Sequence, residues 1–312
     1  MGDLPGTSNR REAARDKARA IREEHRKEER RRRIRLQALI AVALVVIAAI
    51  IAYTLISSQG GGDSGPQNMA SDGIVIGKDF KAERTPGLAS GESPIPTARD
   101  KKSSVVSIRV YLDYFCPECK QFESANRSQL TSWLKSGAIT LEIHPIAIFD
   151  RNSLGSLYSS RSANAGACVA NYSPDDYWAF TQQMYASQPK AGTGGLDNGQ
   201  IVAVIRTAGA HNLSKITSCV NSDKFKDWVS ASTSRALTGP LPDSTAKKVP
   251  GTLTVIVDGQ DFPITSADVR SAAAFAAFVE QAAGSQFDSS GSTPSPTPTP
   301  TSIPIPVPTP TK

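Results

Sequence analysis

The chain has 312 residues, which is enough for one large domain or two small ones. Residues 1–35 hold 13 of the 35 Lys and Arg and 7 of the 29 Asp and Glu, so the rest of the chain carries 22 residues of each sign. The pI near 9.1 therefore reflects one short segment, which argues against a nucleic-acid-binding domain. Four cysteines are too few for a small disulfide-rich scaffold.

The first 72 residues predict a charged stem, a membrane helix and a linker. Residues 36–57 are 22 residues without a charge, and such a helix spans roughly 33 Å, close to the ~30 Å hydrocarbon core of a bilayer. Five arginines between Arg30 and Arg35 precede it, so the positive-inside rule places the stem, residues 1–35, in the cytoplasm. We expect an uncleaved, single-pass signal anchor in the cell membrane; a cleavable signal peptide is the alternative. Residues 58–72 read as a flexible linker.

Residues 73–285 predict one α/β domain. Strands are expected at residues 73–77, 104–113, 138–148 and 251–257, with a hairpin turn leading into 261–265. Helices are expected at 117–135, several times within 153–235, and at 266–286. Residues 286–312 form a Pro/Thr-rich tail, which we expect to be extended and disordered.

The motif Cys116-Pro117-Glu118-Cys119 lies between a predicted strand and a predicted helix. At a helix N-terminus the free N–H groups and the positive end of the dipole stabilise a thiolate on Cys116. Pro117 suits the first helical turn. Cys119, one turn further and less exposed, is placed to attack a mixed disulfide formed at Cys116. We interpret the pair as a redox-active dithiol; a structural disulfide and a zinc site, which needs a second close Cys/His pair, are the alternatives.

Two acidic residues neighbour this dithiol. Glu118 puts a carboxylate beside Cys116, where like charge disfavours the thiolate and predicts a weaker oxidant than a relative with His at this position. Asp113 is either a proton relay or, more simply, a polar residue at a strand end. The chain contains no G-x-S-x-G, Walker A or H-E-x-x-H motif. We expect no metal and no cofactor, because the disulfide itself carries the electrons.

The segment VYLDYFCPECKQFE, residues 110–123, resembles the active-site segment of the DsbA-like thioredoxin-fold family, particularly its membrane-anchored actinobacterial members. The resemblance covers residues 73–285. It implies a thioredoxin fold with a helical insertion at about residues 153–235. It further implies a protein thiol–disulfide oxidoreductase that acts on exported proteins with free thiols and is recycled by a VKOR-type membrane oxidase. A disulfide reductase or isomerase, as in cytochrome maturation, and a non-enzymatic anchored binding module are the alternatives.

The resemblance also implies a second, non-catalytic disulfide in the insertion. Cys168 and Cys219 fall in predicted helices there, and an oxidising compartment would favour a bridge between them. Such a bridge closes a loop of about 50 residues and contributes about 4 kcal/mol in the chain-entropy model. Two buried free thiols are the alternative.

One loop departs from the family pattern. The family places a cis-proline opposite the dithiol, in a Gly-Thr-Pro-Thr run, whereas this chain reads Pro250-Gly251-Thr252-Leu253. Either Pro250 supplies the cis bond or the site lacks one. A cis bond before Leu253 costs about 2.5–4 kcal/mol, so we expect that bond to be trans, with Leu253 facing the dithiol.

Overall fold

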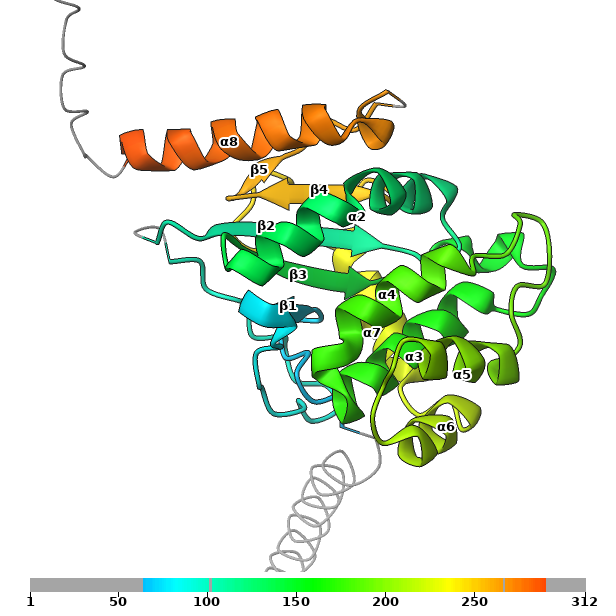
Figure 1. Ribbon diagram of the computed structural model, residues 1–312. Coiled ribbons are helices and arrows are strands. Elements are labelled where there is room, and N and C mark those ends of the chain that lie inside the picture. The colour runs from blue at the N-terminus through cyan, green and yellow to red at the C-terminus, as the bar shows by residue number, and fades with distance from the viewer. Residues whose placement is uncertain (1–63, 101–102, 266, 290–312) are drawn as a thin grey trace, which may run out of the picture. The chain divides into compact units, whose positions relative to one another are not determined.

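The computed structural model describes residues 64–100, 103–265 and 267–289 (Figure 1). The predicted stem, the predicted membrane helix at residues 36–57 and residues 290–312 of the predicted tail lie outside these ranges. Within the described ranges, no helix combines the length and the apolar character needed to cross a bilayer. The membrane anchor and its orientation therefore stay predictions.

Residues 64–72, which we expected to be part of a flexible linker, pack onto the domain. The side chain of Met69 is 1% exposed, and the amide of Asn68 donates to the carbonyl of Ala170 at 2.8 Å. The linker prediction is wrong for these residues, because composition averaged over the segment conceals the apolar burial of Met69. At the other end, the last helix continues to Ser289, three residues beyond the predicted helix.

The centre of the fold is a five-stranded mixed sheet in the order β1-β3-β2-β4-β5. Only β2 and β3 run parallel; the other pairs are antiparallel. Their bounds are Ile74–Ile76 (β1), Val106–Leu112 (β2), Ile139–Pro145 (β3), Thr254–Val257 (β4) and Gln260–Asp261 (β5). Because β2 and β3 are parallel, their carboxyl ends meet at one edge, where loops bring distant residues together.

The helices follow the expected order. They are α2 (Pro117–Ser136), α3 (Tyr158–Tyr172), α4 (Tyr177–Ala186), α5 (Asn198–Thr207), α6 (Leu213–Asn221), α7 (Lys226–Thr238) and α8 (Ala272–Ser289). Short 3-10 turns lie at Lys78–Phe80 (η1), Phe149–Asn152 (η2), Pro174–Asp176 (η3) and Asp268–Arg270 (η4). Helices α3–α7 form the insertion between β3 and β4, and several of them lie beyond the carboxyl end of β2 and β3 in Figure 1. The chain thus has a mixed α/β fold with a helical insertion.

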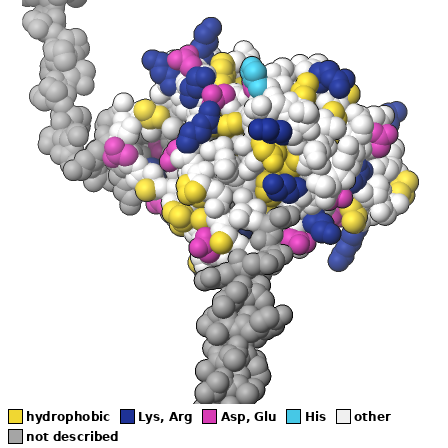
Figure 2. Space-filling model, turned by 90° about the horizontal axis from the view of Figure 1, so that it is seen from below, with side chains coloured by type: hydrophobic (Ala, Val, Ile, Leu, Met, Phe, Trp, Pro, Cys, Tyr) yellow, Lys and Arg dark blue, Asp and Glu magenta, His cyan; other side chains and the backbone are white. Residues whose placement is uncertain are grey.

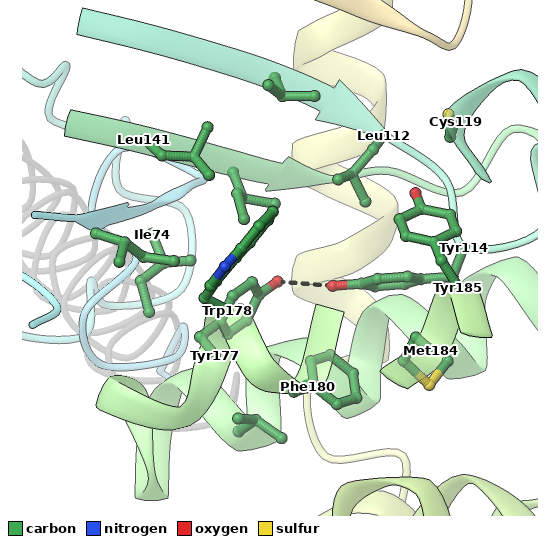
Figure 3. Packing of buried hydrophobic residues seen from close by; sticks show 14 of the residues in the cluster. Ile74, Leu112, Tyr114, Cys119, Leu141, Tyr177, Trp178, Phe180, Met184 and Tyr185 are labelled. Atoms are coloured by element: carbon green, nitrogen blue, oxygen red, sulfur yellow. Dashed lines mark hydrogen bonds between the residues drawn. The ribbon is translucent and has the colours of Figure 1, made fainter. Parts of the chain in front are cut away.

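Successive side chains along β2 and β3 point to opposite faces of the sheet, so the core has two layers, one on each face. One face of the sheet packs against α2 and the aromatic residues of α4 (Figure 3). The side chains that β2 and β3 contribute to this layer are Val110, Leu112, Leu141 and Ile143. The alternate residue Tyr111 belongs to a second cluster with Ala236 of α7. Helix α8 extends the first layer, because Phe275 stacks edge-on against Phe122 of α2 with ring centroids 5.0 Å apart.

A buried ionic cluster fixes the N-terminal segment to the second face. Arg109 donates to Glu142 at 2.7 Å, and the hydroxyls of Ser71 and Thr97 donate to the same carboxylate at 2.6 and 2.8 Å. Burial raises the pKa of Glu142, but the charges of His144 and Arg109 and these hydrogen bonds outweigh burial and hold its pKa well below the usual value. Glu142 is therefore a charged anchor for residues 71–97.

Surface charges are mixed in sign. On the face in Figure 2, Lys and Arg side chains are scattered, with Asp and Glu side chains and small apolar areas among them. This distribution agrees with the near-neutral balance of the chain after residue 35. The described residues on this face form no continuous basic stripe of the kind that follows a nucleic-acid backbone.

Candidate active site

Cys116 occupies the N-cap position of α2, at the carboxyl end of β2. Its backbone is extended, with φ −72° and ψ 121°, and Pro117 takes up the first turn of the helix. The sulfur accepts a hydrogen bond from the backbone N–H of Cys119 at 3.2 Å. The strand-to-helix geometry that the motif predicts is therefore present, and it points a helix N-terminus at the Cys116 sulfur.

Both cysteines are free thiols and both are buried. Cys116 is 0% and Cys119 is 1% exposed, so the expectation that Cys119 is the less exposed residue is wrong. Helix position alone predicts that difference, whereas both residues belong to the buried hydrophobic cluster. Burial raises the pKa of the Cys119 thiol well above its ordinary value, and the hydrogen bond and charge of Cys116 act in the same direction. Cys119 is thus a thiol at neutral pH.

Glu118 lies against the Cys116 sulfur, as its place in the motif suggests. The thiol donates to Oε2 of Glu118 at 3.5 Å, and the Glu118 side chain is otherwise exposed. This contact favours the protonated thiol, because the carboxylate accepts from S–H and repels a thiolate.

Asp113 is buried and bound on both carboxylate oxygens. Oδ1 accepts from the N–H of Phe115 and the hydroxyl of Ser159, each at 2.8 Å. Oδ2 accepts from the N–H groups of Ile148 and Phe149 at 2.8 and 3.0 Å. Burial raises the pKa of Asp113 although these bonds favour its charged form. The contacts match the simpler interpretation of Asp113 as a strand-end residue, since it ties the dithiol turn to the segment after β3 and to α3.

The insertion contributes polar side chains for which the sequence carries no motif. The hydroxyl of Tyr185 donates to the carbonyl of Asp113 at 3.2 Å. The amide of Gln188 donates to the carbonyls of Tyr114 and Cys116 at 3.0 and 2.9 Å. Figure 3 shows Tyr185 and Tyr114 near Cys119. These contacts join residues about 70 positions apart, so only the tertiary structure reveals them.

The loop before β4 places Leu253 on the dithiol side. Leu253 is 7% exposed and lines a cavity of about 20 Å³ together with Cys119 and Tyr185, whereas Pro250 is exposed. The Thr252–Leu253 peptide is cis, so the expectation of a trans bond there is wrong. That expectation considers only the local free-energy cost of a cis bond. It does not include the packing of Leu253 beside Cys119.

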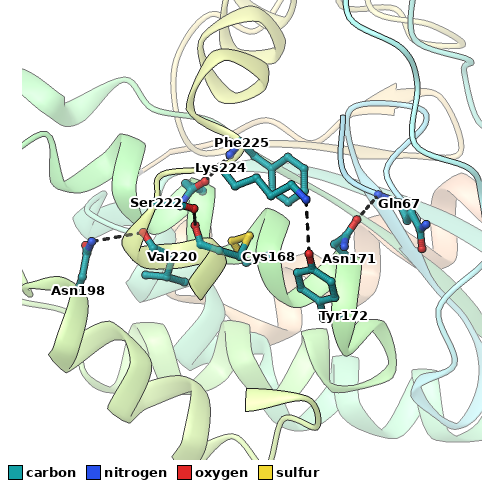
Figure 4. The surroundings of a disulfide bond; sticks show 11 residues. Gln67, Cys168, Asn171, Tyr172, Asn198, Val220, Ser222, Lys224 and Phe225 are labelled. Carbon is teal, nitrogen blue, oxygen red and sulfur yellow. Dashed lines mark hydrogen bonds between the residues drawn. A yellow bond between two sulfur atoms is a disulfide. The ribbon is translucent and has the colours of Figure 1, made fainter. Parts of the chain in front are cut away.

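Cys168 of α3 and Cys219 of α6 form a disulfide (Figure 4). The sulfurs are 2.04 Å apart and the Cα atoms 5.9 Å apart. Next to it, the N–H of Phe225 donates to the buried side chain of Asn164 at 2.8 Å. The disulfide thus joins α3 to α6 within the insertion, where both cysteines are buried. It involves neither Cys116 nor Cys119.

The described residues also lack the arrangement that a metal site requires. No group of three or more His, Cys, Asp or Glu residues within it is arranged to hold a metal ion.

Comparison with known proteins places the domain in a family. The family model described as thioredoxin matches residues 98–275, more than half of the chain. The chain belongs to the thioredoxin family. No curated protein matches its sequence.

Several solved structures of bacterial proteins match the chain. Oxidised DsbA from Mycobacterium tuberculosis is 23% identical over 68% of this chain and 93% of its own, with a TM-score of 0.49. MdbA from Actinomyces oris, a thiol-disulfide oxidoreductase, is 21% identical over 57% of this chain and 80% of its own, with a TM-score of 0.46. BdbD from Bacillus subtilis is 14% identical over 72% and 98%, with a TM-score of 0.49.

Proposed function

We propose that this protein is an extracytoplasmic thiol–disulfide oxidoreductase that forms or exchanges disulfides in exported proteins through Cys116 and Cys119. One observation carries the proposal. In a domain of the thioredoxin family, the Cys116 sulfur caps the N-terminus of α2 and accepts the N–H of Cys119 at 3.2 Å. That environment makes a cysteine a good leaving group and a stabilised thiolate.

In the oxidising direction the protein starts with a Cys116–Cys119 disulfide. A substrate thiolate attacks the sulfur of Cys116, the bond between the two cysteine sulfurs breaks, and its electron pair stays on Cys119. Cys119 then takes up a proton, because burial raises its pKa well above the ordinary value. A second substrate thiolate attacks the substrate sulfur of the mixed disulfide and expels Cys116. The substrate loses two electrons and two protons. The enzyme gains the two electrons, one proton goes to Cys119, and the other goes to Cys116 or, while Cys116 stays a thiolate, to solvent.

The location outside the cytoplasm is supported by two features. The Cys168–Cys219 bridge fits a compartment that maintains disulfides. The apolar run at residues 36–57, with arginines before it, fits a bilayer anchor with a cytoplasmic N-terminus. In this arrangement a membrane oxidase of the VKOR type would reoxidise the Cys116–Cys119 dithiol. The substrates would be exported proteins with free thiols.

A reductase or isomerase is the second candidate. The specific observation in its favour is the Glu118 carboxylate at 3.5 Å from the Cys116 sulfur, which disfavours the thiolate and weakens the protein as an oxidant. Either direction uses the same two sulfurs.

Transfer of a disulfide to a defined peptide tests the proposal. The full chain, oxidised and purified in detergent, is mixed with a reduced peptide that contains two cysteines. We expect the peptide to become oxidised while the protein gains two thiols. We expect the Cys116→Ser variant, in which oxygen replaces sulfur, to fold and to transfer nothing. Equal transfer by wild type and Cys116→Ser would overturn the proposal.

A further inference from the structure

Gln188 reaches the dithiol turn from the helical insertion. It lies two residues beyond α4, and its side-chain amide donates to the carbonyl of Tyr114 at 3.0 Å and to that of Cys116 at 2.9 Å. Pro189 follows, and a residue before proline is biased toward extended backbone. The backbone of Gln188 is therefore restricted, and its side-chain amide reaches the two carbonyls on either side of Phe115.

Tyr185, near the C-terminal end of α4, forms a third hydrogen bond to the turn between β2 and α2. The hydroxyl of Tyr185 donates to the carbonyl of Asp113 at 3.2 Å. That carbonyl also accepts the N–H of Cys116 at 3.0 Å, and the Cys116 carbonyl accepts the N–H of Lys120 at 3.2 Å. The carbonyl oxygens of Asp113, Tyr114 and Cys116 thus accept hydrogen bonds from α4 or the segment just after it. Those of Asp113 and Cys116 also accept N–H groups from the turn and from α2.

The bond to Cys116 has an electrostatic consequence for its sulfur. A carbonyl oxygen carries partial negative charge and disfavours a thiolate on the same residue. The N–H of Gln188 brings partial positive charge to that oxygen, which favours the thiolate. Because the disulfide form of Cys116 is neutral, this contact stabilises the reduced protein more than the oxidised protein.

We propose that Gln188 is a positioning residue through which the insertion sets the reduction potential of the Cys116–Cys119 pair. It acts in opposition to Glu118: the amide of Gln188 favours the Cys116 thiolate, and the carboxylate of Glu118 disfavours it. Stabilising the reduced form makes a dithiol a stronger oxidant, so the two side chains set the strength of the oxidant between them. The inference rests on the proposed function, since it assumes that this dithiol exchanges disulfides.

Equilibration with glutathione tests it. The full chain is equilibrated at graded ratios of reduced to oxidised glutathione, and the fraction of Cys116–Cys119 disulfide is measured by thiol trapping. The variants are Gln188→Ala, which removes the donor, and Gln188→Glu, which keeps the size. The matched control is Gln183→Ala in α4, five residues before Gln188, because the bonds to the Tyr114 and Cys116 carbonyls come from Gln188 and not from Gln183.

We expect Gln188→Ala to shift the equilibrium about 2- to 10-fold toward the protein disulfide, the effect of one hydrogen bond. Gln188→Glu should shift it further in the same direction, because a carboxylate cannot donate and adds negative charge. Gln183→Ala should match wild type. Thermal unfolding of both redox forms gives a second readout: the reduced form should lose more stability than the oxidised form.

A purely structural role predicts a different pattern. Both redox forms of Gln188→Ala would then lose equal stability, and the glutathione equilibrium would equal that of wild type, which overturns the inference. A shift toward the dithiol in either Gln188 variant overturns it too. A wild-type protein whose cysteines never exchange with glutathione would refute the proposed function and this inference together.

Discussion

Glu118 holds a carboxylate oxygen 3.5 Å from the sulfur of Cys116, and removing its charge should make the protein a stronger oxidant. At that separation, a unit charge raises the free energy of a thiolate by about 1 kcal/mol in water-like surroundings and by about 5 kcal/mol at an effective dielectric near 20. Because the Glu118 side chain is exposed, solvent screening favours the lower figure. About 1 kcal/mol corresponds to about fivefold in the equilibrium constant and about 20 mV for this two-electron couple.

Glu118→Gln keeps the shape of the side chain and removes the charge, and Glu118→His adds a group that can carry the opposite charge. We expect the reduction potential of the full chain, measured against glutathione, to rise in the order wild type, Gln variant, His variant. The gap should narrow at high salt, because screening weakens the repulsion. Glu83→Gln, another exposed carboxylate on the N-terminal segment, is the control. A Gln variant with an unchanged or lower potential in low salt would refute the electrostatic reasoning.

Three further outcomes follow from the geometry. Cys119→Ala lacks the resolving thiol and should accumulate mixed disulfides through Cys116 on non-reducing gels, whereas trapping by Cys116→Ala instead would reverse the assignment of the nucleophile. Non-reducing digestion and mass spectrometry should find Cys168 linked to Cys219, and replacing both with Ala should cost about 4 kcal/mol of unfolding free energy; free thiols at both positions in the exported protein would contradict this. The lowered pKa of Glu142 gives stability that is present above the unfolded-state pKa of about 4.3 and lost as pH falls through the lower folded-state value. Glu142→Gln should therefore lower the melting temperature at neutral pH, with a deficit that shrinks in strong acid; a deficit independent of pH would contradict the pKa argument.

The sequence predicts those parts of the fold that local pattern determines. Strand alternation places β2 and β3 within a few residues of their observed ends, and the spacing of Cys116 and Cys119 between a strand and a helix locates the candidate site. Both signals act over a few residues, where periodicity and helix capping operate directly.

Features that depend on tertiary contacts could not be predicted in this way. The burial of Cys116 and the cis bond before Leu253 reflect packing around the turn, which local cost and helix position do not describe. Gln188 stands in no motif, and its bond to Cys116 spans 72 positions. Met69 lies next to a Gly-rich segment whose composition suggests a linker, although its side chain is buried.

The reduction potential of the Cys116–Cys119 pair tests the central claim most directly. The full chain is equilibrated with glutathione or dithiothreitol buffers of known potential, and the two thiols are counted by mass after alkylation. A disulfide-forming enzyme requires one two-electron transition that depends on both cysteines, at a potential nearer the roughly −120 mV of DsbA than the roughly −270 mV of thioredoxin. A potential near that of thioredoxin would contradict the oxidising direction, and the absence of any transition would contradict the assignment of this dithiol as the redox centre.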